Sequence, residues 1–185
     1  METPLTPLEF ARRTRKLYGD REGVVDGDLR MTYEQFFDRC DRWSAALQGM
    51  GVKKGDRVAY IAPNTHEQLE SFYAVPQIGA VLVPINYRLT PDDFVYITTH
   101  SGAKVLCVHP DHMEAVDSVR GRLESVEHFV ALGSAGGRGM RDQRWSGASA
   151  QIERDAEGDA KRVRPSRSRS CRASRSCRRS WVRRL

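Results

Sequence analysis

The sequence has no long apolar run, and this argues against a membrane-spanning helix. A helix needs about 18–20 consecutive apolar residues to span a bilayer. The longest apolar run here, residues 78–85, has only the length of a strand. The N-terminal residues lead into the basic cluster of residues 12–16 without the apolar stretch of a secretory signal. We therefore expect neither a membrane span nor secretion.

Cysteine is scarce as well, with four residues in the chain. Cys40 falls on an apolar helical stripe and Cys107 in an apolar strand, where a free cysteine packs as a small hydrophobic residue. Cys171 and Cys177 have no neighbouring histidine or carboxylate that would complete a metal site. We expect no disulfide framework, and hence a reducing, cytoplasmic environment.

Acidic residues are absent from residues 161–185, which hold ten Arg, one Lys, six Ser and two Cys. The formal charge of +6 thus divides into −5 over residues 1–160 (19 basic, 24 acidic) and +11 over this tail. A basic pI commonly indicates a nucleic-acid or membrane-surface partner, but here it describes the tail and not the folded part. Such a composition cannot bury enough apolar surface to offset its ordering entropy, so we expect an Arg/Ser-rich, disordered tail.

Four segments have sequence patterns typical of helix N-termini. Thr6 is predicted to cap a helix that has Pro7 in its first turn, with Glu9 placed to reach back to the cap. This helix is expected to end near residue 18. Thr32 with Gln35 forms a capping-box pattern, and an apolar stripe follows at helical spacing. Further helices are predicted over residues 65–79 and 90–102, with a weaker one over 111–123. The stripe of the second helix consists of Phe36, Cys40, Trp43, Leu47 and Met50.

Strands alternate with these helices. Apolar residues at 24–25 and 29–31 flank Asp26-Gly27, which predicts a hairpin with a two-residue turn. Buried-type strands follow at residues 57–62, 81–83, 104–108 and 126–132, and Pro84 is expected to end the second of them. Helix-length crossovers between strands predict a parallel sheet covered on both faces.

The predicted fold class is therefore α/β: a partial doubly wound, mostly parallel sheet with an N-terminal helix and a β-hairpin. Residues 5–132 are expected to form this folded segment. Residues 133–160 contain no apolar face and are expected to be a linker of low order, followed by the tail at 161–185.

Four stretches together resemble the N-terminal region of the adenylate-forming (AMP-binding) superfamily, and most closely its fatty-acyl-CoA synthetases. Each stretch is weak alone, but their order and intervals are specific, and the resemblance covers about residues 5–132. They are residues 20–25 with 31–36 (DREGVV, MTYEQF), 51–58 (GVKKGDRV), 61–65 (IAPNT) and 79–89 (GAVLVPINYRL).

The resemblance implies an activity, with ATP, Mg²⁺ and CoA as cofactors of the complete family. Members activate a carboxylic acid as acyl-AMP and then transfer the acyl group to the CoA thiol. It also implies a role for Arg88, whose counterpart in N-x-R-L contacts the nucleotide phosphates of CoA. A guanidinium suits that geometry. A surface arginine flanking a helix is the alternative interpretation of Arg88.

The family's phosphate loop, "T-S-G-T-T-G-x-P-K-G", does not occur in this sequence, nor do its later adenylation motifs and C-terminal lysine. Without groups that stabilise the phosphoryl charge, the main electrostatic contribution to catalysis is missing. We expect this chain to be inactive alone, with no catalytic residue and no cofactor bound by it alone. We also expect no metal site, because His109 and His112 (His-x-x-His) lack an evident third ligand and the five histidines fit surface or loop roles.

Three interpretations of residues 161–185 remain open. A shifted reading frame in a GC-rich gene produces such Arg/Ser/Cys mixtures, and this one begins near the point where the phosphate loop is due. A basic arm that binds nucleic acid is the second interpretation, which the short, irregular repeats do not favour. In the third, the chain is a binding or scaffolding module that docks onto a synthetase, or self-associates, through exposed apolar surface.

Overall fold

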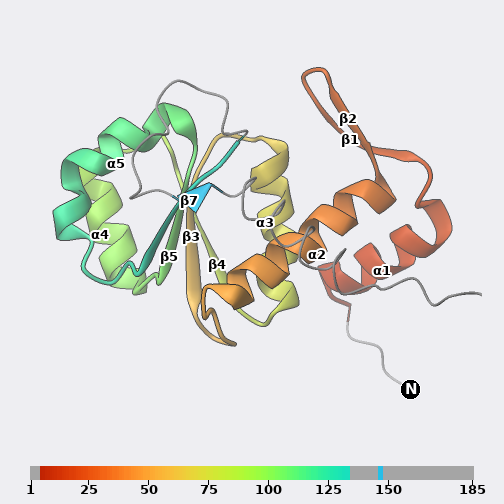
Figure 1. Cartoon of the computed structure of the whole chain (residues 1–185), viewed down its shortest axis with the longest axis horizontal. Helices are drawn as coiled ribbons and strands as arrows, with labels where there is room; N and C mark the ends of the chain where they lie inside the picture. Colours follow the sequence, from red (N-terminus) through yellow and green to blue (C-terminus); the bar gives the residue numbers. More distant parts are fainter. Residues whose placement is uncertain (1–4, 134–145, 148–185) are drawn as a thin grey trace, which may run out of the picture.

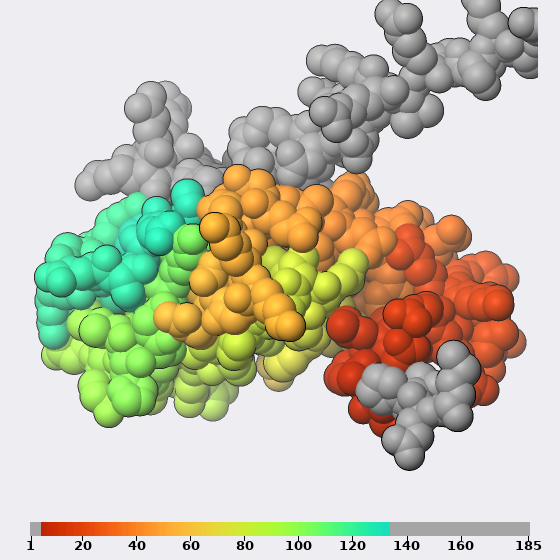
Figure 2. Space-filling model, turned by 90° about the horizontal axis from the view of Figure 1, so that it is seen from below, coloured from red at the N-terminus to blue at the C-terminus, as the bar shows by residue number. Residues whose placement is uncertain are grey.

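The computed structural model describes residues 5–133 and 146–147 of the chain (Figure 1). The Arg/Ser-rich tail and most of the expected linker lie outside these residues. None of the described helices is long and apolar enough to cross a bilayer. Figure 2 shows the N-terminal elements at one end of the molecule and residues 110–133 at the other.

The N-terminal part consists of helix α1 (Pro7–Tyr18), the hairpin strands β1 (Glu22–Asp26) and β2 (Leu29–Thr32), and helix α2 (Tyr33–Gly49). The predicted caps are present: the Thr6 hydroxyl accepts from the backbone N–H of Glu9, and Thr32 and Gln35 form a complete capping box. The Glu9 carboxylate, however, pairs with Arg12 at 3.0 Å. Its predicted return to the cap is replaced by this pair within the helix.

The hairpin turn lies one residue later than the sequence pattern indicates. Asp26 pairs with Leu29 across the hairpin, so the two loop residues are Gly27 and Asp28. Gly27 has φ +57°, a left-handed conformation that suits glycine. As a consequence Asp26 is the last residue of β1.

The main sheet follows the order β4-β3-β5-β6-β7, and all of its pairings are parallel. Its strands are β3 (Arg57–Ile61), β4 (Val81–Ile85), β5 (Val105–Val108), β6 (His128–Ala131) and the two-residue β7 (Ser146–Gly147). This order is that of the flavodoxin-like doubly wound sheets. The predicted fold class, an α/β protein with an N-terminal helix and hairpin and a parallel sheet, is confirmed.

Helices cover both faces of this sheet (Figure 1). Alternate strand residues point to opposite sides, so Val58 and Tyr60 join the core beneath α2 and α3 (His66–Gln77), whereas Ala59 and Ile61 join the core beneath α4 (Pro91–Ser101) and α5 (Met113–Val119). The predicted stripe of α2 lies in the first core, with Met50 partly buried at its end. Trp43 Nε1 donates a hydrogen bond to the Tyr60 hydroxyl at 2.5 Å and so ties α2 to β3.

Two element predictions need correction. Pro84 does not end its strand, because it lies within β4 and pairs with Tyr60. A proline is tolerated there since β4 is an edge strand, whose unpaired side needs no N–H donor. The weak helix expected over residues 111–123 is divided into the 3-10 helix η1 (Pro110–His112), α5 and a second 3-10 helix, η2 (Arg120–Arg122).

Candidate functional site

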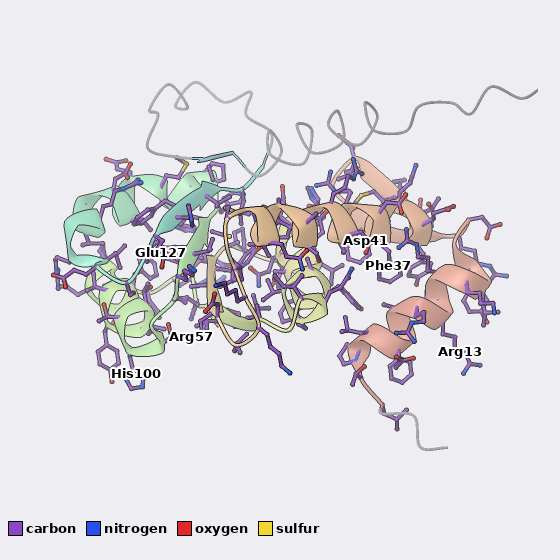
Figure 3. The ribbon with its side chains drawn as sticks, turned by 60° about the horizontal axis from the view of Figure 1, so that its bottom comes forward. Arg13, Phe37, Asp41, Arg57, His100 and Glu127 are labelled. Atoms are coloured by element: carbon purple, nitrogen blue, oxygen red, sulfur yellow. The ribbon has the colours of Figure 1, made fainter. Side chains whose placement is uncertain are left out.

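The amino edge of the parallel sheet is occupied by interactions of the protein with itself. Arg57 donates to the carbonyls of Ser101 at 2.8 Å and Gly102 at 2.7 Å. Lys104 lies 3.6 Å from Asp56 and 3.5 Å from Glu127. Figure 3 shows Arg57 and Glu127 at this end of the molecule. The charged groups here hold the strand starts together.

The carboxyl edge carries the loops that follow β3, β4, β5 and β6. In a sheet of this order the chain turns outward in opposite directions from β3 and β5, and ligands bind in the crevice at that switch point. Residues 62–66 follow β3, and residues 109–112 follow β5. The backbone N–H of His109 donates to the Ile61 carbonyl at 2.9 Å, which closes the base of the crevice.

Three side chains of types that can bind metal ions, Asp26, His66 and Glu67, lie close together beside this crevice. His66 Nδ1 lies 2.7 Å from Asp26 Oδ2 and 3.3 Å from Glu67 Oε2. The backbone N–H of His66 also donates to Asp26 Oδ2, at 2.9 Å. These two hydrogen bonds from His66 hold the pKa of the Asp26 carboxyl below its ordinary value. The hairpin is thereby fastened to the start of α3.

A groove begins at this cluster and runs along α3. One part, of about 260 Å³, lies between β1 and α3. A second, of about 270 Å³, lies between α3 and the end of β4. The two parts share Asn64, Gln68 and Phe72. The groove therefore joins the hairpin to the loop that follows β4.

Gln68, one of the residues that line this groove, has a buried side-chain oxygen without a partner among the described residues. Its side chain is 8% exposed, and Oε1 has no hydrogen-bond partner among the described residues. A buried amide oxygen without a partner costs about 1–3 kcal/mol. Such an atom favours a ligand or an ordered water that donates a hydrogen bond to it.

Arg88, the residue for which a CoA contact was predicted, lies in the loop after β4 at the same edge. Its side chain is exposed and lies 5.4 Å from the centre of the Tyr87 ring. Its backbone N–H donates to Asn86 Oδ1 at 3.0 Å, which shapes the turn. In the described part of the chain Arg88 forms no ion pair, so the guanidinium is available to an anion.

The His-x-x-His pair does not converge on one point. The ring centres of His109 and His112 are 6.4 Å apart, and His112 packs against Tyr87. The described cysteines, Cys40 and Cys107, are free and buried as predicted. Burial raises the pKa of Cys107 to about 12 and raises that of Cys40 still further, so neither is a thiolate nucleophile at neutral pH.

A larger cavity of about 530 Å³ lies between α1 and α2, away from the carboxyl edge. Phe37 and Asp41 project from α2 toward it (Figure 3). Arg15 crosses from α1 and pairs with Asp38 and, at 2.6 Å, with Asp41. Because the Arg15–Asp41 ion pair spans it from one helix to the other, we interpret this cavity as a packing gap between two helices.

The fold is that of a doubly wound α/β protein with a groove at the carboxyl edge of its sheet, and the comparisons define its family. The model of the AMP-binding enzyme family matches residues 10–169. The chain belongs to the AMP-binding enzyme family, as the resemblance in its sequence predicted.

Curated relatives carry the names of acid–CoA ligases. A long-chain-fatty-acid–CoA ligase of Thermus thermophilus is 38% identical over 136 residues, covering 71% of this chain and 25% of that protein. A 4-hydroxybutyrate–CoA ligase 2 of Metallosphaera sedula is 38% identical over 121 residues, covering 65% and 22%. The chain thus spans about a quarter of the length of these relatives.

Solved structures agree in fold. The anthranilate CoA ligase AuaEII, in complex with anthranoyl-AMP, matches with a TM-score of 0.73 at 26% identity, covering 83% of this chain and 30% of that one. The N-terminal domain of FACL13 from Mycobacterium tuberculosis matches with a TM-score of 0.66 at 27% identity, covering 78% and 34%.

The Asp26–His66–Glu67 cluster was missed from the sequence. His66 was interpreted as a surface or loop residue, and Asp26 as part of a turn. No local pattern could have paired them, because they are 40 residues apart and meet only after the hairpin docks on α3.

Proposed function

We propose that this chain carries the N-terminal part of an acid–CoA ligase that activates a carboxylic acid with ATP and Mg²⁺ and transfers it to CoA. The observation that carries the proposal is the match to the AMP-binding family together with relatives named as acid–CoA ligases. The relatives' names cover fatty, hydroxy and aromatic acids. A fatty acid is the substrate class we favour, since the sequence motifs most resemble fatty-acyl-CoA synthetases.

We further propose that the chain as given does not catalyse the reaction alone. Acid activation needs donors and cations around the phosphates of ATP, and these supply most of the barrier reduction. The glycine-rich phosphate loop of the family is not in the sequence. The parallel sheet and its groove would then serve as the scaffold on which such a loop is positioned in longer relatives.

An assay for acid-dependent AMP formation tests this proposal. The purified full chain is incubated with ATP, Mg²⁺, CoA and a panel of acetate, benzoate and long-chain fatty acids. The expected result is no AMP above the level of a boiled control for any acid. Saturable, acid-dependent AMP release by the full chain would contradict the proposed inactivity.

For Arg88 we propose a contact to the nucleotide phosphates of CoA. Its support is geometric: an exposed guanidinium in the β4–α4 loop, with no ion-pair partner in the described residues. Replacing Arg88 with Ala is expected to weaken CoA binding at least 5-fold and to reduce its salt dependence, because one charge-assisted phosphate contact is lost. Because we expect no stable CoA complex of this chain alone, ligand-observed NMR with CoA at millimolar concentration, which detects weak contacts, measures both effects.

The matched control for this experiment is Arg13→Ala. Arg13 is exposed on α1, at the end of the molecule away from the parallel sheet (Figure 3). The same charge is removed, but far from the carboxyl edge. Equal losses in the two variants would mean that CoA responds to net charge alone, and the proposed role of Arg88 would be wrong.

A second function, docking onto a partner or onto another copy of the chain, is favoured by one observation. Val25, Leu69 and Phe72 line the groove between β1 and α3 and are 53%, 39% and 47% exposed. We call them the Val25–Leu69–Phe72 patch. Contiguous exposed apolar side chains of this kind mark interaction surfaces.

A further inference from the structure

We propose that Asp26, His66 and Glu67 form a binding site for a divalent transition-metal ion, with Zn²⁺ as the reference ion. The proposal concerns side chains that have no role in the acid–CoA ligase function argued above, and it does not rest on that function. In the described part of the chain these three side chains form one group of potential ligands, with their ligand atoms all within 4.8 Å of one another.

His66 Nδ1 faces more hydrogen-bond acceptors than it can donate to. His66 Nδ1 faces two carboxylate oxygens, Asp26 Oδ2 at 2.7 Å and Glu67 Oε2 at 3.3 Å. An imidazole nitrogen carries at most one proton, so it can donate to one of these oxygens well and not to both. A cation placed among the three atoms would be bound by all of them.

The two carboxylates of the cluster are partly buried and have no lysine or arginine side chain paired with them among the described residues. The Asp26, Glu67 and His66 side chains are only 34%, 13% and 17% exposed. The ligand oxygens of the two carboxylates lie within 4.8 Å of each other, so a cation between them would contact both. Among the described residues no Lys or Arg forms an ion pair with Asp26 or Glu67. His109 is a further titratable group that acts on Asp26.

The types of ligand in the cluster favour a transition-metal ion. One imidazole nitrogen with two carboxylates suits Zn²⁺, Mn²⁺ or Fe²⁺ better than Mg²⁺, which prefers oxygen ligands alone. Ligand atoms around tetrahedral Zn²⁺ lie about 3.3–3.6 Å apart, given bond lengths near 2.0–2.2 Å. The Glu67 to His66 distance already matches this spacing, and Asp26 would withdraw by roughly half an ångström.

Two independent observations indicate that a ligand belongs here. Gln68, in the same helical turn, lines the groove together with Asp26 and His66, and its buried amide oxygen has no hydrogen-bond partner among the described residues. The cluster also lies at the carboxyl edge of the sheet, beside the switch point between β3 and β5, where α/β sheets bind ligands. Three protein ligands leave coordination positions for water or for an oxygen of a bound molecule.

Zn²⁺ titration of the full chain by calorimetry tests the proposal. Because thiols of the tail would also bind Zn²⁺, the parent is the Cys171→Ser/Cys177→Ser variant. We expect one Zn²⁺ per chain with a micromolar Kd, a rise in melting temperature with Zn²⁺, and at least 10-fold weaker binding of Mg²⁺. Absence of saturable one-to-one Zn²⁺ binding would overturn the proposal.

Glu67→Gln is the decisive variant, because it replaces a carboxylate ligand by a neutral, more weakly binding amide and leaves the Asp26–His66 hydrogen bond in place. Its melting temperature without metal should equal that of the parent, while Zn²⁺ binding weakens at least 10-fold. His66→Gln should weaken it further. His100→Gln is the control, since His100 is exposed on α4 (Figure 3) and should leave the Kd unchanged within 2-fold. A Glu67→Gln variant that binds Zn²⁺ like the parent would refute the site.

Discussion

At the scale of single residues, the ion pair of Glu70 and Arg39 is notable because its carboxylate is buried. The Glu70 side chain on α3 is 3% exposed, and its carboxylate accepts from Arg39 Nε on α2 at 2.5 Å. Burial raises the pKa of Glu70, and the Arg39 guanidinium acts against that rise. The charge of Glu70 is therefore tolerated between the two helices chiefly because Arg39 is there.

Replacing Arg39 with Ala is expected to lower the free energy of unfolding by about 3 kcal/mol at pH 7, since a buried carboxylate loses its cation. A carboxyl whose folded pKa is raised destabilises the fold above that pKa, and the cost disappears as the pH falls toward its ordinary value of 4.5. The difference from the parent should therefore shrink as the pH falls from 7 toward 4.5. Urea denaturation at a series of pH values measures it.

Arg42→Ala is the matched control on the same helix. Arg42 donates to the carbonyl of Asp38, within α2 itself. Its replacement is expected to change stability by no more than about 0.5 kcal/mol. If both variants lost the same stability at every pH, the role given to Arg39 would be wrong.

At the scale of elements, α4 has the best-defined ends. Thr90 and Asp93 form a complete capping box, and Gly102 ends the helix with φ +60°. The hydrogen bonds from Thr90 lower the pKa of Asp93 below its ordinary value of 3.8. A carboxyl of this kind contributes stability above pH 3.8, which is lost as the pH falls through its folded pKa.

The variant Thr90→Ala is expected to cost about 1 kcal/mol at pH 7, the usual value of an N-cap side chain. Thr99→Ala, in the last turn of the same helix and exposed, should cost less than about 0.5 kcal/mol. Thermal unfolding followed by circular dichroism compares the two. The Thr90 cost should also diminish below pH 3.8, and a cost that grew there would contradict the capping role of Asp93.

These elements show which features a sequence can predict. The caps at Thr6, Thr32 and Thr90 were predictable because each joins residues three apart. The prediction for Pro84 was wrong, because the effect of a proline on a strand depends on whether the strand is at the sheet edge. That property belongs to the sheet and not to the local sequence.

The residues of the candidate site were harder to predict from the sequence than the helix caps. Arg88 could be singled out through a family motif, but the sequence did not place a site at the carboxyl edge of the sheet. The Asp26–His66 contact spans 40 residues and the Arg39–Glu70 contact 31. Such pairs depend on how helices and hairpin dock, and neither their spacing nor their residue types identify them beforehand.

At the scale of the whole molecule, the exposed Val25–Leu69–Phe72 patch bears on association. Because apolar surface of this kind favours self-contact, we expect the full chain to associate increasingly with concentration. The double variant Leu69→Lys/Phe72→Lys should shift the sedimentation coefficient toward that of the monomer. Tyr96→Lys, at a 69% exposed residue on α4, is the control and should not. A parent that remains monomeric at high concentration would contradict this expectation.

The central position of β3 sets the order in which the sheet can be completed on the ribosome. Ile61 pairs with both Ile85 and Val108, so its second neighbour is synthesised about 47 residues after it. At typical rates of about 5–20 residues per second, β3 lacks that neighbour for roughly 2–10 s. Until β4 is made, both edges of this apolar strand are unpaired, and one edge remains unpaired until β5 follows. A nascent chain that stalls between β4 and β5 would present that edge to chaperones or to other nascent chains.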